Sequence, residues 1–145
     1  MKPSDIPTSI SQYISHHYPE HSKISYYMDT ENDSSYYAAD FKFQKRSYSL
    51  LFTLEGNWFE TEILLPFEKL PAQVSKSIED KLRTDFSTSR ILKTQEVDVQ
   101  GMLLYELEIE GKKNNEMVFN EYFFDRKGVF IKMEAIELKA IPSFF

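Results

Sequence analysis

Residues 70–86 read LPAQVSKSIEDKLRTDF, and this stretch decides the fold. Its apolar residues recur at every fourth position, at Val74, Ile78, Leu82 and Phe86. Because this spacing places them on one side of a helix, the stretch predicts an amphipathic helix from Pro71 to Phe86. Pro71 suits the first helical turn, where a backbone N–H has no intrahelical partner.

A second stretch near the N-terminus has the same pattern. Ile6-Pro7 corresponds to Leu70-Pro71, and the apolar residues that follow it are Ile10, Ile14 and Tyr18. We expect this helix to run from Pro7 to Tyr18, because Pro19 disfavours helical backbone in the residue before it. The chain therefore contains one helix signal twice, which predicts a duplicated unit.

Strand patterns follow each predicted helix, with apolar and aromatic residues alternating with polar ones. In the first half the predicted strands are Lys23–Asp29, Ser35–Gln44, Ser47–Leu54 and Trp58–Leu65. In the second half they are Arg90–Asp98, Met102–Glu110, Glu116–Asp125 and Val129–Leu138. The connections are short, and Gly56 can take the positive φ of a tight turn. Short turns favour antiparallel pairing of consecutive strands.

The predicted fold class is α+β, with two tandem helix-plus-four-stranded antiparallel sheet units in one compact two-repeat domain. We place the first repeat at residues 1–66 and the second at residues 67–145. Each sheet needs one face covered, and the helix stripe is the available apolar cover. The first stripe is predicted to face Ala39, Phe41, Phe43, Phe52 and Phe59. The second is predicted to face Leu107, Ile109, Phe124, Ile131 and Met133.

The opposite faces of the two sheets are left for function. The predicted register gives the first of these faces Tyr27, Tyr36, Lys42, Trp58 and Glu60. On the second open face, the predicted residues are Glu106, Glu108, Phe130 and Lys132. Aromatic side chains among charged ones are typical of a surface that binds a protein or a ligand. Trp58, the sole tryptophan, is either part of this surface or structural cover for the sheet.

Composition limits the partners. The net charge of −6 disfavours binding to nucleic acid or to an anionic membrane surface. The chain has no cysteine, which excludes disulfides, thiol catalysis and cysteine-based zinc sites. No apolar run reaches the roughly 18 residues of a membrane span. Met1-Lys2-Pro3-Ser4-Asp5 lacks the apolar core of a signal peptide, so the chain is either cytoplasmic or a mature exported form.

Three histidines, His16, His17 and His21, lie close together in the sequence. A metal site needs ligands that converge on one point. His16 and His17 are adjacent and point to different sides of a helix, and Pro19 lies between them and His21. We therefore interpret the cluster as a solvated helix C-terminus, where a protonated histidine interacts favourably with the helix dipole.

The acidic stretch from Asp29 to Asp40 resembles the oxygen spacing of a calcium loop. However, Ser34 stands where that loop needs glycine, and Asp40 stands where it needs glutamate. A turn between strands explains the stretch more simply. The sequence also lacks a Gly-Xaa-Ser-Xaa-Gly elbow and a nucleophile beside a base, so we expect no enzyme, no metal and no cofactor.

Two sequence features together suggest a family. One is the apolar-Pro pair that opens each helix-plus-four-strand unit. The other is a strand ending in aromatic residues, an acid and a glycine turn, Phe123-Phe124-Asp125-Arg126-Lys127-Gly128, which follows Tyr105–Ile109 and is echoed by Phe52–Trp58. From about Asp5 to Leu138 the chain resembles the PepSY-like family, whose fold is similar to that of β-lactamase-inhibitor proteins.

The resemblance implies a non-enzymatic protein, typically exported to the periplasm or cell surface of bacteria. We therefore expect a non-catalytic binding protein whose exposed antiparallel sheet face binds a protein partner. The expected contact residues are Trp58, Tyr27, Tyr36, Lys42 and Phe130. The alternative is a small-ligand or calcium-responsive periplasmic binding module that uses the cleft between the repeats. A cytoplasmic location and any oligomeric state stay open.

Overall fold

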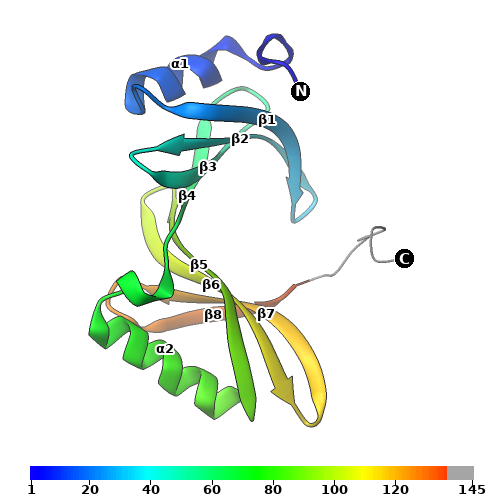
Figure 1. Cartoon of the computed structure of the whole chain (residues 1–145). Helices are drawn as coiled ribbons and strands as arrows, with labels where there is room; N and C mark the ends of the chain where they lie inside the picture. The colour runs from blue at the N-terminus through cyan, green and yellow to red at the C-terminus, as the bar shows by residue number, and fades with distance from the viewer. Residues whose placement is uncertain (137–145) are drawn as a thin grey trace. The chain divides into compact units, whose positions relative to one another are not determined.

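The computed structural model describes residues 1–136, and Figure 1 shows its helices and strands. The helical elements are η1 (Pro3–Asp5), α1 (Thr8–His17), η2 (Phe67–Lys69) and α2 (Ala72–Asp85). The strands are β1 (Ser22–Glu31), β2 (Ser34–Phe43), β3 (Arg46–Phe52), β4 (Trp58–Leu64), β5 (Thr88–Val99), β6 (Met102–Lys113), β7 (Glu116–Asp125) and β8 (Phe130–Ala135). The strands are hydrogen-bonded in chain order from β1 to β8. The α+β class is confirmed, and residues 137–138 of the last predicted strand lie outside the described residues.

The structure forms two compact units. Unit 1 contains Met1–Leu65 and Gln95–Leu103, and unit 2 contains Pro66–Thr94 and the chain from Leu104 onward. The C-terminal half of β5 therefore belongs to unit 1, and its N-terminal half belongs to unit 2. The division into repeats at residues 1–66 and 67–145 stays a prediction.

Within residues 1–136, four hairpins turn through two consecutive residues that both have positive φ. These pairs are Asn32-Asp33, Gln44-Lys45, Gln100-Gly101 and Asn114-Asn115. Positive φ at both central residues is the requirement of the type I′ turn, whose twist matches that of the flanking strands. Asn and Asp tolerate this conformation better than Gln and Lys. The strand boundaries are thus fixed largely by local turn chemistry.

The core of unit 1 lies between α1 and one face of its sheet. Pro7 occupies the N-cap position of α1, so the helix begins one residue later than the sequence predicts. Ile10 and Ile14 are fully buried. They pack in one cluster with Ile6, which directly follows η1, and with the strand residues Tyr26, Ala39, Phe41, Leu50 and Phe52. Tyr18 and Phe43 are half-buried against the same cluster, as predicted.

Gly56, in the turn between β3 and β4, packs against the start of α1. Its φ is +87°, and a Cβ added there would lie 2.3 Å from Ser9 Oγ. The Ser9 hydroxyl donates a hydrogen bond of 3.0 Å to the carbonyl oxygen of Gly56. Gly128, with φ +93°, lies in the same way against the first turns of α2, near Val74 and Ser77. Each glycine turn therefore fits closely under the helix of its own unit.

We expect Gly56→Ala to lower the free energy of unfolding by about 2 kcal/mol or more, through the strain of a left-handed alanine and the clash with Ser9. Gly101→Ala is the matched control, because Gly101 also has positive φ but its Cβ would meet nothing within 4 Å. Urea denaturation of both variants measures the difference. Equal destabilisation by the two substitutions would show that the contact with Ser9 is unimportant.

The core of unit 2 lies between α2 and the sheet face that it covers. Val74, Ile78 and Leu82 are buried on the predicted helix stripe. The strand residues buried with them are Leu107, Ile109, Tyr122 and Phe124. Ile131 and Met133 are exposed, because they lie on the terminal strand β8. Met133 still lies on the face that the sequence predicts, since it is opposite the buried Tyr122, whereas Ile131 is the extra residue of a register shift in β8.

Phe86 ends α2 and packs directly on the backbone of β6. A Cβ added to Gly111 would lie 2.5 Å from Cδ1 of the Phe86 ring. Glycine at position 111 is therefore required for this ring to lie flat against the strand. The predicted apolar stripe therefore extends to Phe86, one residue beyond the end of α2 at Asp85.

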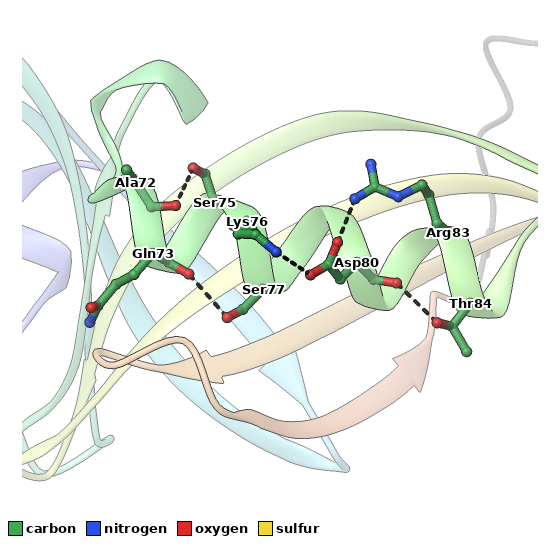
Figure 2. Close-up of polar contacts among 8 residues, drawn as sticks. All are labelled: Ala72, Gln73, Ser75, Lys76, Ser77, Asp80, Arg83 and Thr84. Carbon is green, nitrogen blue, oxygen red and sulfur yellow. Dashed lines mark hydrogen bonds and ion pairs between the residues drawn. The ribbon is translucent and has the colours of Figure 1, made fainter.

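The opposite side of α2 is exposed and polar, as Figure 2 shows. Asp80 accepts from Lys76 at 3.3 Å and from Arg83 at 2.5 Å. The hydrogen bonds of Arg83 and Lys76 hold the pKa of the Asp80 carboxyl below its usual value. The Thr84 hydroxyl donates to the Asp80 carbonyl oxygen. Among the residues drawn, the polar groups contact their own helix, which is typical of a solvated face.

Candidate functional site

The candidate site is the face of the unit 1 sheet that points away from α1. We call it the unit 1 open face and define it by Tyr27, Tyr36, Asp40, Lys42 and Phe59. Side chains alternate between the two faces of a strand. In β2 the alternate residues Tyr37, Ala39 and Phe41 contact the core cluster. Their neighbours Tyr36, Asp40 and Lys42 therefore point to the other side.

Tyr27 lies at the centre of this face. It is opposite Ala38 in the β1–β2 register, between Tyr36 and Asp40 on the neighbouring strand. Its hydroxyl donates a hydrogen bond of 3.0 Å to Asp40 Oδ1. Burial, followed by the negative charge of Asp40, raises the pKa of Tyr27 to about 12. The hydroxyl is therefore neutral at ordinary pH and stays a hydrogen-bond donor.

Tyr36 and Phe59 form a stacked aromatic pair on the same face. Their ring centroids are 4.8 Å apart, with 24° between the ring planes. The Gln100 side chain fixes the strand beneath them, because its amide donates to the carbonyl oxygens of Trp58 (3.1 Å) and Phe59 (2.8 Å). The pair is therefore a rigid apolar surface presented by paired strands rather than by a loop.

Trp58 points to the opposite side from the one predicted. It packs, half-buried, against the core cluster of unit 1. Its indole N–H donates to Thr61 Oγ1 at 2.8 Å. The cause is a register shift between β3 and β4, because Leu51 pairs with Glu60 but Phe52 pairs with Trp58. The extra residue exchanges the positions predicted for Trp58 and Phe59, since a one-residue shift in a strand reverses its faces.

Lys42 lies at the end of the face, near the turn between β2 and β3. Its ammonium group donates to Ser47 Oγ on the paired strand. The structure therefore brings together Tyr27, Tyr36 and Lys42, three of the residues that the sequence predicts for partner binding. It adds Asp40, which alternation places beside Tyr36 and Lys42 but which was not among the predicted contact residues, and Phe59, which the sequence places in the core.

A row of carboxylates crosses the corresponding open face of unit 2. Glu108 on β6 is opposite Glu121 on β7, and Glu121 is opposite Glu134 on β8. The hydrogen bond that protonated Glu121 donates to the Glu106 carboxylate, then burial and the negative charges of Glu106, Glu108 and Glu134, raise the pKa of Glu121 to about 9. Lys132 forms an ion pair of 2.8 Å with Glu134 at the end of the row.

Phe130, the remaining predicted contact residue, does not lie on this open face. Its ring centroid is 5.7 Å from both Tyr122 and Phe124, which belong to the core of unit 2. Lys81 of α2 places its ammonium group 4.4 Å from the ring centroid. A register shift between Phe123 and Phe124 explains the change of side. The placement of Phe130 beside Lys132 on one face was wrong.

The family described as "Putative beta-lactamase-inhibitor-like, PepSY-like" matches residues 35–132. This span is more than half of the chain and runs from the start of β2 to the middle of β8. The chain belongs to the PepSY-like family. No curated protein matches the sequence.

Solved structures share the fold of this PepSY-like protein. A BLIP-like protein from Bacteroides fragilis matches with a TM-score of 0.73 and 15% identity, over 94% of this chain and 90% of the other. A DUF2874 family protein from Bacteroides ovatus matches with a TM-score of 0.75 and 16% identity, over 97% and 96%. A protein from Bacteroides eggerthii, named among "putative periplasmic proteins", matches with a TM-score of 0.71 and 19% identity, over 90% and 89%. At these identities the likeness shows the fold alone.

Unit 2 of the PepSY-like chain also contains a groove of about 810 Å³. Its lining is mostly apolar and includes Phe86, Met117, Val118, Phe119, Phe130 and Met133. Lys81 and Lys113 supply positive charge, and Asp85 accepts hydrogen bonds from Lys81 (3.3 Å) and from the Tyr122 hydroxyl (2.7 Å). An apolar groove with a few polar groups is the usual form of a small-molecule site.

Residues 1–136 contain no group of three or more His, Cys, Asp or Glu side chains placed to hold a metal ion. The ring nitrogens Nδ1 of His17 and His21 each lie 2.9 Å from a backbone carbonyl oxygen, those of Tyr13 and Tyr18. A search of the same residues for a helix long and apolar enough to cross a membrane also finds none.

The carboxylate row makes the stability of unit 2 depend on pH. Folded Glu121 keeps its proton well above the ordinary value of 4.5, so the folded state binds a proton that the unfolded state has lost. The free energy of unfolding therefore falls as pH rises from about 4.5 to about 9. We expect Glu121→Gln, which cannot ionise, to raise the melting temperature of the protein increasingly across that range.

Melting curves at several pH values between these limits measure the effect. Glu116→Gln is the matched control, because Glu116 is exposed on the same strand and its side chain is distant in register from Glu121. A constant difference between Glu121→Gln and the wild type at every pH would contradict the raised pKa of Glu121.

Proposed function

We propose that this protein is a non-catalytic, exported binding protein that contacts a protein partner through the unit 1 open face. The observation that carries the proposal is the stacked pair of Tyr36 and Phe59 beside the Tyr27–Asp40 hydrogen bond, on a sheet face that α1 leaves uncovered. Ordered aromatic side chains next to charged groups are the usual centre of a protein-binding surface.

The packing beneath these aromatic side chains supports the proposal. Ala38 and Leu51, which point to the same side as Tyr27 and Tyr36, are only 1% and 2% exposed. Tyr27 is itself 38% exposed. The residues beneath the aromatic side chains are therefore excluded from solvent, while the aromatic side chains themselves are accessible. A partner can bury their apolar area without any rearrangement of the strands.

Membership of the PepSY-like family supports a protein as the partner and the periplasm or cell surface as the location. The description of the matching family names a β-lactamase-inhibitor-like fold, and this favours a protein as the partner and binding rather than catalysis. The protein from Bacteroides eggerthii with the same fold is named as periplasmic. This supports export to the periplasm or the cell surface.

We expect Tyr36→Ala to weaken partner binding about tenfold or more, because truncation of a central aromatic contact residue has large effects. A photo-crosslinking residue at position 36 captures the partner from a periplasmic extract, and titration of the purified partner then compares the wild type with Tyr36→Ala. Lys76→Ala on the exposed side of α2 is the control and should bind like the wild type. Unchanged affinity of a folded Tyr36→Ala protein would overturn the proposal.

The groove of unit 2 supports a second candidate, the small-ligand module. Its volume of about 810 Å³ is within the range of ligand pockets, roughly 300–1,000 Å³. The apolar walls of the groove suit the hydrocarbon chain of an anionic amphiphile, and Lys81 and Lys113 in its lining suit the anionic group. The alternative also has a calcium-responsive form, in which calcium rather than an amphiphile stabilises the folded protein.

We expect dodecanoate to raise the melting temperature if the groove binds ligands, because a ligand that binds only the folded state stabilises it. Val118→Trp fills the groove and should abolish the shift. Val129→Trp is the control, because Val129 is exposed and does not line the groove. A shift with calcium but not with dodecanoate would favour the calcium-responsive module instead.

A further inference from the structure

The terminal strand β8 has one free edge. It pairs with β7 on one side, and within residues 1–136 no strand pairs with its other side. All six of its residues are exposed, and Ile131 and Met133 are 47% and 49% exposed. Proteins normally protect a free edge of this kind, because its unpaired backbone groups and apolar side chains favour pairing with another strand.

The hydrogen bonds to β7 show which backbone groups of β8 point outward. The N–H of Ile136 donates to the carbonyl oxygen of Phe119 at 3.0 Å. Residues alternate between hydrogen-bonded and non-hydrogen-bonded positions in an antiparallel pair. Lys132 and Glu134 therefore direct their backbone groups toward β7, as Ile136 does. Met133 and Ala135 direct theirs toward the free edge.

The order of residues in β8 is self-complementary about Met133. If two copies of the strand lie antiparallel with Met133 opposite Met133, then Lys132 of each copy is opposite Glu134 of the other. Ile131 of each copy is then opposite Ala135 of the other. The two Met133 residues, one from each copy, then form a hydrogen-bonded pair, because the backbone groups of Met133 point toward the free edge. The Lys132–Glu134 pairs fall at non-hydrogen-bonded positions, where facing side chains are closest.

The same arrangement brings a positive charge next to the negatively charged carboxylate row of unit 2. Glu134 ends the row that begins with Glu108 and Glu121. Lys132 of the second copy would extend this row with a positive charge. Glu134 would then lie between two ammonium groups, since it already pairs with Lys132 of its own chain at 2.8 Å. Opposite charges on facing strands stabilise the pairing.

We propose that two copies of this protein associate through β8, antiparallel about a two-fold axis at Met133, so that their unit 2 sheets become continuous. A two-fold interface uses the same surface on both subunits, which a self-complementary strand satisfies. The occupant of the free edge is thus a second copy of this chain. The proposal is independent of partner binding at the unit 1 open face, which lies on other strands.

Charge reversal tests the interface without changing the core. In Lys132→Glu, glutamate faces Glu134 of the second copy at both pairs. In Glu134→Lys, lysine faces Lys132 in the same way. We expect each single variant to weaken the dimer about tenfold, because like charges directly opposite destabilise strand pairing. An equimolar mixture of the two variants should restore association, since glutamate then faces lysine at both pairs.

Analytical ultracentrifugation of the full chain over a range of concentrations measures the association. Lys76→Glu is the charge-matched control and should dimerise like the wild type, because Lys76 lies on the exposed side of α2. Thermal melts verify that each variant is folded. The proposal is overturned if the wild type stays monomeric at millimolar concentration, if the single variants dimerise like the wild type, or if their mixture stays monomeric.

Discussion

In each unit, a stripe of apolar side chains along one helix is buried against one face of the sheet. Ile10 and Ile14 make this contact in unit 1, and Val74 and Ile78 make it in unit 2, each fully excluded from solvent. Complete burial of one such side chain is worth roughly 1.5–3 kcal/mol. Because the helix occupies one face of the sheet, it also determines which face remains for polar groups and for recognition.

Periodicity alone predicts most of this architecture, because helix stripes and strand alternation are local properties of the sequence. The predictions fail where the register shifts. Phe59 is an extra residue in β4, and a comparable shift directly follows Phe130 on β8. Each shift changes the face on which an aromatic side chain lies, while the alternating pattern of the sequence continues through it. Trp58 and Phe130 were misplaced for this reason.

The candidate site was predictable to a similar extent. Alternation in β1 and β2 selects Tyr27, Tyr36 and Lys42, because the β1–β2 register is regular from Ser25 to Glu31 and β2 pairs with β3 without a shift. The role of Gln100 could not be predicted, since it depends on a side chain that reaches two carbonyl groups about forty positions earlier. The carboxylate row likewise requires the pairing of three strands, which no single strand pattern contains.

The chain-order pairing of the strands has a consequence for folding kinetics. Since each strand pairs with the next one along the chain, the closing loops are short and the contact order within each meander is low, which favours fast folding. The rate then depends on how readily each two-residue turn forms. Gln44-Lys45 is the least suited of them, because neither residue favours positive φ. Between the two hairpins of unit 1 that have two-residue turns, we therefore expect the hairpin of β2 and β3 to form more slowly than the hairpin of β1 and β2.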